Sequence, residues 1–440
     1  MDRSNFYNII HLSLSFFLIL TPFGVTQIFQ TSSDHAKDGA LALAITSLVF
    51  CLTNLVLSSY ITRSLGVRLT LIFSSVAYVP FIASNIKYNR WTLYISGFLV
   101  GVGAALLWTA QGVYVTISTN KHEQVNNLVP SSTRGLMNGT FFVPSSTRGL
   151  MNGTFFGIFQ LHQIIGNLLV SFLFHIKLDE WIIFTILTSI CGLGTFSLIF
   201  LRPVEIPKDG KKQSILSSLS ILFDIRFLFL IPTMCYSGLS QGFIAAAVPP
   251  LIVDKSWKYL IFGLFGTVSA VSYVFFGKLS DLIGRRLLIF AIGALAHMTI
   301  FVLLLLVWKP PLDQNNTEIF LILVIGLSIG DAIFGTLLYS IIGTFYEESR
   351  LADAFACLKV FQAGSTAIAF VEDVYVPFSI QVLCLIILLS LAFITLIYEH
   401  YGITSLDTGK TRMSIQKENK KETEADIEGQ FAYATLSNET

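Results

Sequence analysis

Twelve stretches of this 440-residue chain are each long and apolar enough to cross a lipid bilayer. The hydrocarbon core is about 30 Å thick, which a helix crosses with roughly 20 apolar residues. Because water does not reach the peptide groups there, a spanning segment must be a helix or part of a closed barrel. The apolar runs do not alternate with polar residues as barrel strands do, so we predict helices. The predicted spans are about 6–29, 40–60, 67–84, 91–113, 153–175, 181–201, 227–252, 258–279, 287–308, 319–345, 351–371 and 377–399.

The composition is that of a chain that lies mostly in lipid. Hydrophobic residues make up 53% of the sequence, charged residues make up 12%, and the formal net charge is +1. A nearly neutral chain cannot neutralise many phosphates, so we predict the lipid bilayer as its surroundings and no nucleic-acid partner. The first apolar run has no small-residue cleavage site after it, so we expect a retained span and not a signal peptide.

No short motif indicates catalysis. The chain has no GxSxG, HExxH or Walker sequence and no TVGYG-type filter. All five cysteines fall inside predicted spans, with no spacing typical of a disulfide framework or metal site: Cys51, Cys191, Cys235, Cys357 and Cys384. We therefore predict that the protein is not an enzyme and needs no metal or cofactor.

The positions of lysine and arginine predict the orientation. If the N-terminus is cytosolic, fifteen of these cations flank the cytosolic ends of the spans and seven flank the opposite ends. Cytosolic loops are enriched in cations, and an even number of spans puts both termini on one side. We therefore predict an integral, multi-pass membrane protein with both termini cytoplasmic. Residence in the plasma membrane and in an endomembrane both stay open.

A lysine-rich link divides the twelve spans into six and six. We predict an N-terminal six-helix half at 1–202, a cytoplasmic linker at 203–226 and a C-terminal six-helix half at 227–400. Residues 401–440 are polar and contain few apolar side chains, so we predict a disordered cytoplasmic tail.

An exact tandem repeat precedes the fifth span. The sequence VPSSTRGLMNGTFF occupies 129–142 and recurs at 143–156, identical at all fourteen positions. Repeat architectures use several copies of longer period, so this duplication does not predict a solenoid. Only the second copy runs directly into a span, and we assign the first copy no function. Among the sequons, Asn315 lies in a predicted exterior loop and is the candidate for glycosylation.

The two halves of the chain repeat a loop pattern. After span 8 the sequence reads GKLSDLIGRRLLIF, with Gly277, Asp281, Gly284, Arg285 and Arg286. After span 2, SYITRSLGVRLTLIF is a weaker version of it. The first pattern resembles the loop signature of the major facilitator superfamily, which implies two six-helix halves and a cytoplasmic gate that breaks and reforms as the halves rock. The alternative is that the two arginines are ordinary cytosolic anchors.

A second resemblance covers nearly the whole chain outside the tail. LWTAQG at 107–112 and the stretch at 326–370 are similar to the Unc-ninety-three-like family, a divergent branch of that superfamily, and above all to its orphan, solute-carrier-like members. The doubled segment before span 5 departs from the family pattern. Family members include an accessory subunit of a potassium channel and an escort of Toll-like receptors. The resemblance therefore implies the fold and leaves the activity open.

Polar residues on the helices expected to line a central cavity are candidates for a substrate or coupling site. In the major facilitator arrangement these helices are spans 1, 4, 7 and 10, which carry Trp108 and Gln111, Gln241, and Asp331. An ionisable residue at membrane depth costs at least about 2.5 kcal/mol, so Asp331 and Lys359 of span 11 should have a partner or a wet cavity. The two residues could pair, or Lys359 could extend to Glu347 and Glu348.

Span 5 carries a further polar face. Gln160, Gln163 and Asn167 lie on one side of the predicted helix, where they could bind substrate or hydrogen-bond a neighbouring helix. Two classes of function therefore stay open. The first is a secondary transporter that moves an unknown small solute by alternating access. The second is a non-transporting accessory or trafficking partner of another membrane protein, either an ion channel or a receptor.

The cation distribution predicts the result of a labelling experiment. In a version without native cysteines, a cysteine at Asp313 should react with an impermeant maleimide added outside the cell. A cysteine at Gly210 should react only after permeabilisation. Labelling in the reverse pattern would invert the predicted orientation.

Overall fold

A computed structural model describes residues 4–125, 147–204, 221–283, 286–308, 317–346 and 348–399. This part of the chain is helical. The helices are α1 (Ser4–Gln30), α2 (Ala36–Val56), α3 (Ser58–Leu65), α4 (Val67–Val76), α5 (Tyr78–Ala83), α6 (Arg90–Val125), α8 (Thr147–His175), α9 (Glu180–Ser197), η1 (Leu198–Phe200), α11 (Ile225–Ala246), η2 (Pro249–Leu251), α12 (Lys255–Ile283), α13 (Arg286–Leu306), α14 (Thr317–Phe345), α15 (Glu348–Tyr375) and α16 (Phe378–Tyr398).

The helices agree with the predicted spans. Eleven described helices are long and apolar enough to cross a membrane, and Val67–Ala83 forms a shorter apolar segment where the third span is predicted. That segment is divided into α4 and α5 close to Pro80. Proline has no N–H, and its ring clashes with the carbonyl four residues earlier, so the regular helix is interrupted there. The chain is thus an integral, multi-pass membrane protein of all-α class.

Helix ends follow local sequence signals. Asp224 begins α11 and accepts a hydrogen bond from the backbone N–H of Arg226 at 3.0 Å. Asp254 accepts one from the N–H of Trp257 at 2.6 Å at the start of α12. These carboxylates partner amide groups that the helix leaves unpaired in its first turn. Gly66 separates α3 from α4 at a φ of +81°, which favours glycine.

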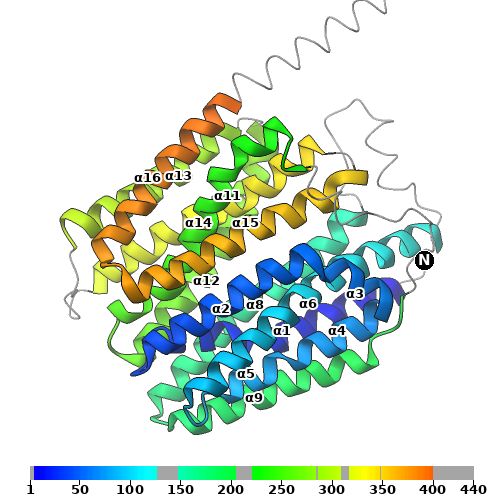
Figure 1. Ribbon diagram of the computed structural model, residues 1–440, viewed down its shortest axis with the longest axis horizontal. Coiled ribbons are helices and arrows are strands. Elements are labelled where there is room, and N and C mark those ends of the chain that lie inside the picture. The colour runs from blue at the N-terminus through cyan, green and yellow to red at the C-terminus, as the bar shows by residue number, and fades with distance from the viewer. Residues whose placement is uncertain are drawn as a thin grey trace, which may run out of the picture.

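The helices form two groups of six spans (Figure 1). Helices α1 to α9, blue to green in the figure, pack on one another, and so do α11 to α16, green to orange. Between the groups, α2 packs along α15 and α8 packs along α12. These pairings build the two-half arrangement that the loop pattern predicts. The boundaries of the two halves stay predictions, because most of the linker lies outside the described residues.

Four helices form the interior of the bundle. In their most apolar windows, α1, α6, α11 and α14 bury 56% to 67% of their residues, whereas the other long spans bury 33% to 44%. These four helices are the first, fourth, seventh and tenth spans, which the sequence predicts to line the centre. The exposed faces of outer helices such as α9 and α16 carry large apolar side chains suited to lipid.

One end of the bundle holds the two groups together. We name it the outer end, with the 31–35, 84–89 and 252–254 loops, and we name the opposite end, with Gly66, the inner end. At the outer end, Thr31 Oγ1 donates to the Ala245 carbonyl at 2.8 Å. Nearby, the hydroxyl of Ser171 donates to the Ser256 carbonyl at 2.8 Å.

Two further contacts join the groups at this end. The Tyr259 hydroxyl donates to the Val25 carbonyl at 3.2 Å, and Lys255 forms an ion pair with Glu180. We call these four contacts the outer seal. Its members come from α1, α8 and α9 on one side and from α11 and α12 on the other. The seal therefore joins the two groups at the outer end in this conformation.

Glycines set the closest helix contacts. A Cβ on Gly330 of α14 would overlap the ring of His297 of α13, and one on Gly101 of α6 would lie 2.7 Å from the Thr46 carbonyl of α2. Gly101 and Gly330 thus allow α6 to pack closely on α2 and α14 to pack closely on α13. Gly238 of α11 is equally constrained, because its Cβ would overlap the Gln362 carbonyl oxygen of α15.

Several predicted features lie outside the described residues. They are the first copy of the tandem repeat, the tail at 401–440, most of the linker, and Asn315. Positions 313 and 210 of the labelling experiment lie there too. All five cysteines are described, and each is a free thiol.

The tight contact at Gly238 predicts a loss of stability on substitution. In Gly238→Ala the new Cβ meets a backbone oxygen, which no side-chain rotation can relieve, so α11 and α15 must separate. Gly192→Ala in α9 is the matched control, because nothing lies within 4 Å of its Cβ position. We expect Gly238→Ala to lower the melting temperature in detergent by several degrees, and Gly192→Ala to leave it unchanged or raised. Equal effects of the two substitutions would contradict this packing.

Candidate functional site

Asp331 and Gln241 form a polar pair on two interior helices. Asp331 lies within α14, and the side chain of Gln241 on α11 donates a hydrogen bond to its carboxylate. Gln241 is exposed and Asp331 is only partly buried, although α11 and α14 are among the most buried spans. Gln241 therefore keeps accessible surface beside Asp331. Tyr236 of α11 and Tyr273 of α12 lie close enough to interact electrostatically with Asp331.

Lys359 makes contacts of a different kind. Its ammonium donates to Gln362 Oε1 at 3.2 Å and lies 5.3 Å from the ring centroid of Tyr339 on α14. No ion pair joins it to Asp331, both residues being described. Of the two predicted alternatives, the structure thus rules out the Asp331 pair in this conformation. The side chains of Glu347 and Glu348, the other alternative, lie outside the described residues.

A short hydrogen-bonded chain links Lys359 to α11. Gln362, which accepts from Lys359, donates through Nε2 to Ser237 Oγ at 3.1 Å. Ser237 lies one helical turn from Gln241, so the two charged residues attach to neighbouring turns of one interior helix. Gly238, which follows Ser237, allows the close approach of α15 that makes these hydrogen bonds possible.

The candidates in the first six spans separate into two groups. Trp108 of α6 packs edge-on against Phe16 and Phe159, with ring centroids 5.6 Å and 5.3 Å away. It therefore belongs to an aromatic cluster between α1, α6 and α8. Gln111 is 5% exposed and Gln160 is partly buried. The structure does not bring these residues into contact with the Asp331 and Gln241 pair.

Gln163 and Asn167 face the second half of the chain. A Cβ on Gly266 of α12 would lie 2.9 Å from the Gln163 Cβ, and one on Gly263 would lie 3.7 Å from the Asn167 Cβ. Asn167 Nδ2 donates to the Gln163 carbonyl at 2.7 Å, and its buried Oδ1 has no hydrogen-bond partner. These residues lie at the α8–α12 contact, which supports the helix-contact alternative over substrate binding.

His297 of α13 is a packing histidine. It is fully buried, its Nδ1 accepts from the Tyr236 hydroxyl at 2.5 Å, and its Nε2 donates to the Leu327 carbonyl at 2.9 Å. Both ring nitrogens are used. Tyr236 is also fully buried, so its side chain has no accessible surface.

The predicted gate motif lies at the junction of α12 and α13. Helix α12 ends at Ile283 and α13 begins at Arg286, so the loop is where the pattern places it. Gly284 and Arg285 lie outside the described residues, and so does the side chain of Asp281. In the first half, Arg68 follows the equivalent glycine and donates from its guanidinium to the Ile199 carbonyl.

A charged cluster at the outer end was not identified from the sequence. Asp38 of α2 accepts hydrogen bonds from Tyr88, from Tyr94 at 2.7 Å and from Arg90 Nε at 3.1 Å. The bond to Asp38 raises the pKa of Tyr88, which lies in the loop before α6. Because these partners lie about fifty residues from Asp38, no local pattern announces the cluster. The only signal was a lone acidic residue at the start of a span.

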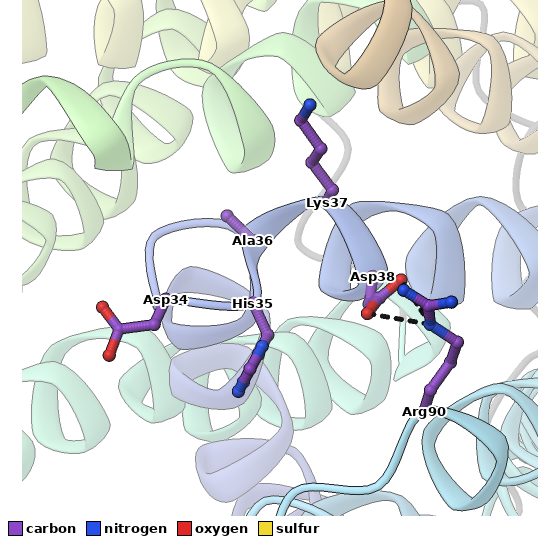
Figure 2. Close-up of a pocket in the computed structure, with 6 residues that line it drawn as sticks. All are labelled: Asp34, His35, Ala36, Lys37, Asp38 and Arg90. Carbon is purple, nitrogen blue, oxygen red and sulfur yellow. Dashed lines mark hydrogen bonds and ion pairs between the residues drawn. The ribbon is translucent and has the colours of Figure 1, made fainter.

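An open pocket of about 450 Å³ adjoins this cluster. Figure 2 shows its lining side chains, with Asp38 bonded to Arg90, Asp34 and Lys37 pointing away from that pair, and His35 turned to the opposite side from Lys37. The lining groups do not converge on one point, and Asp38 already has three donors. This arrangement is a structural clamp between the α1–α2 turn and α6. Among the described residues, no group of three His, Cys, Asp or Glu side chains could hold a metal ion.

Comparisons with known proteins agree with this architecture. Residues 31–397 match the family model described as "Ion channel regulatory protein UNC-93". UNC93-like protein 3 of Arabidopsis thaliana is 28% identical, over 86% of this chain and 82% of the relative. Protein unc-93 homolog A of Homo sapiens is 27% identical, over 90% and 93%. A crystal structure of the nucleoside transporter NupG, in a mutant form, superposes with a TM-score of 0.59 at 13% identity, covering 90% of this chain and 98% of NupG, and shows the fold.

The separation of Asp331 from Lys359 predicts that their substitutions act independently. Asp331→Asn and Lys359→Gln each remove a charge and keep the shape. Residues without shared partners that lie more than about 7–10 Å apart usually couple by less than about 0.5 kcal/mol. We therefore expect the changes in melting temperature of the two single variants to add in the double variant.

The Asp331 and Gln241 pair supplies the control double-mutant cycle. Asp331→Ala and Gln241→Ala remove two groups in contact, which typically couple by about 0.5–3 kcal/mol. Thermal unfolding in the same detergent measures both cycles. Recovery of stability in the Asp331→Asn, Lys359→Gln double variant would reveal an ion pair and contradict the separation.

Proposed function

The chain belongs to the UNC-93 family and has the major facilitator fold, and on that premise we propose that it is a secondary transporter of a small solute. The observation that carries this proposal is the Asp331 and Gln241 pair on interior helices. A carboxylate inside a membrane span is costly and usually marks a substrate or ion pathway. In secondary transporters such sites lie near the midplane, between the two halves that rock against each other. The position of Asp331 in the middle of α14 supports the proposal, since that is the depth expected of such a site.

The outer seal supports the same mechanism. Its four contacts join the halves through a few hydrogen bonds, which are reciprocal between Ser171 and Ser256, and through one exposed ion pair, each individually weak. Such contacts can break and reform during alternating access. The glycine contacts within each half, by contrast, are tight and allow the halves to move as units. We further propose that the inner end faces the cytosol, so that this conformation opens inward.

A second candidate is an accessory or trafficking partner of another membrane protein. The family description, an ion channel regulatory protein, favours it. So does the first-half loop, where Arg63 stands at the position of Asp281 in the second half. With an arginine in place of the aspartate, the first-half loop cannot form the charge network expected of the second-half loop. In this role the fold would hold one conformation, and a stoichiometric partner would co-purify in gentle detergent.

A disulfide across the outer seal tests alternating access without a known substrate. In a version lacking native cysteines, Gln241→Cys reports accessibility, and the Ser171→Cys, Ser256→Cys pair locks the seal, because the native hydroxyl oxygens are 3.3 Å apart. We expect Gln241→Cys to react with an impermeant maleimide added from either face. After oxidation of the locked pair, labelling from the outer face should disappear and return with reductant.

The matched control lies within one half. Ser15 and Ser197, on α1 and α9, have hydroxyl oxygens 3.0 Å apart. Cross-linking Ser15→Cys to Ser197→Cys should leave labelling from both faces intact. If Gln241→Cys never reacts from the outer face in the unlocked protein, the chain does not alternate and the accessory role is preferred.

A further inference from the structure

Two opposite charges in the second half are held by neutral groups alone. Asp331 accepts from Gln241, and Lys359 donates to Gln362 beside the Tyr339 ring. Neither has an oppositely charged partner among the described residues. Both side chains are partly buried, and both lie beside exposed neighbours, since Gln241 is exposed and Tyr339 is 40% exposed. Two unmatched charges therefore border the interior of the same half.

Each charge keeps unused bonding capacity. A carboxylate offers about four lone-pair sites and an ammonium offers three donors, of which the protein uses few here. In a span, a charged group without a counter-ion is costly, so it normally faces a partner or water. The glutamine amides orient the two charged groups without neutralising them. No described residue supplies either counter-charge, so a bound solute is the source that we consider.

The spacing of the two groups can be estimated along two routes. On α14, Tyr339 lies eight residues beyond Asp331, or about 12 Å along the helix axis at 1.5 Å per residue. On the other route, one turn of α11 and three residues of α15 separate Gln241 from Lys359, which gives about 10 Å. The routes agree on roughly 10–12 Å. After allowing about 2.8 Å for each charge-assisted hydrogen bond, a gap of roughly 5–6 Å is left.

We propose that the solute is a zwitterion whose amine binds Asp331 and whose carboxylate binds Lys359, with roughly 5–6 Å between its charged groups. This inference rests on the transporter function proposed above and names its substrate class. A purely cationic solute would leave Lys359 unmatched, and a purely anionic one would leave Asp331 unmatched. A zwitterion neutralises both in one binding event. Its length corresponds to a short ω-amino acid or a dipeptide.

Blocking each charge of one small probe tests the proposal on the unmodified protein. The probes are glycine, 4-aminobutanoate and 8-aminooctanoate, with N-acetyl-4-aminobutanoate and 4-aminobutanamide as the blocked forms. A ligand that binds the folded state raises the melting temperature. We expect 4-aminobutanoate to do so at concentrations at least about 10-fold lower than either blocked form, because each loses one charged hydrogen bond. Glycine, too short to reach both groups, should bind more weakly.

Variants assign each end of the probe. In Asp331→Asn, the acetylated probe and 4-aminobutanoate should become equivalent, since the amine has lost its partner. In Lys359→Gln, the amide probe and 4-aminobutanoate should become equivalent. Asp34→Asn and Lys37→Gln are matched controls from the outer pocket (Figure 2). Both should keep the full preference for 4-aminobutanoate over the two blocked probes.

The outcomes separate this inference from the transporter function. The substrate class is rejected if a blocked probe binds the unmodified protein as tightly as 4-aminobutanoate does. It is also rejected if none of the three amino acids raises the melting temperature. If the control variants lose the preference, the charges that select the probe lie elsewhere. Two-sided labelling of Gln241→Cys would still support transport in those cases. Loss of that labelling rejects the transporter function itself.

Discussion

Close packing of helices in lipid is the constraint on which the rest of this structure depends. Lipid tails are as apolar as leucine side chains, so burial of apolar surface does not drive helices together there, and close contact must come from small residues. Gly238 meets the backbone of Gln362 and brings α15 against α11. That approach lets Gln362 bond to Ser237 and hold Lys359 near the interior. The position of the candidate site thus follows from a glycine.

The outer seal differs in kind from the close helix contacts, which occur within each half and also between the halves where Gly266 of α12 approaches Gln163 of α8. Within each half, glycines bring helix backbones together, and a contact of this sort cannot slide without a clash. Between the halves, the outer seal consists of isolated hydrogen bonds and the Lys255–Glu180 ion pair. Gln163 and Asn167 also lie at this junction, where Asn167 Oδ1 stays unpaired. Isolated polar contacts of this kind can break and reform, as the rocking of two halves proposed above requires.

Much of the fold and part of the site could be predicted from the sequence. Hydropathy located the spans because a membrane helix needs a long apolar run whatever its neighbours are. Asp331 and Lys359 stood out because ionisable residues are rare in such runs. Gln241 was a candidate as a polar residue of an interior span, but its contact with Asp331, ninety residues away, could not be predicted. Gln362 did not stand out, because a neutral residue in a span carries no charge to mark it. Asp38 was overlooked for a similar reason, because its partners come from α6 and the loop before it.

The sequence by itself determined the helical class, the twelve apolar segments and the two charges that a bilayer makes expensive. Each of these depends on the local composition of a segment and on the surrounding lipid. Only the tertiary structure decided that Asp331 bonds to Gln241, that Lys359 stays apart from it, and that the α8 polar face meets α12. Those outcomes depend on the rotation and depth of each helix. Packing between distant segments sets both, and no single segment encodes them.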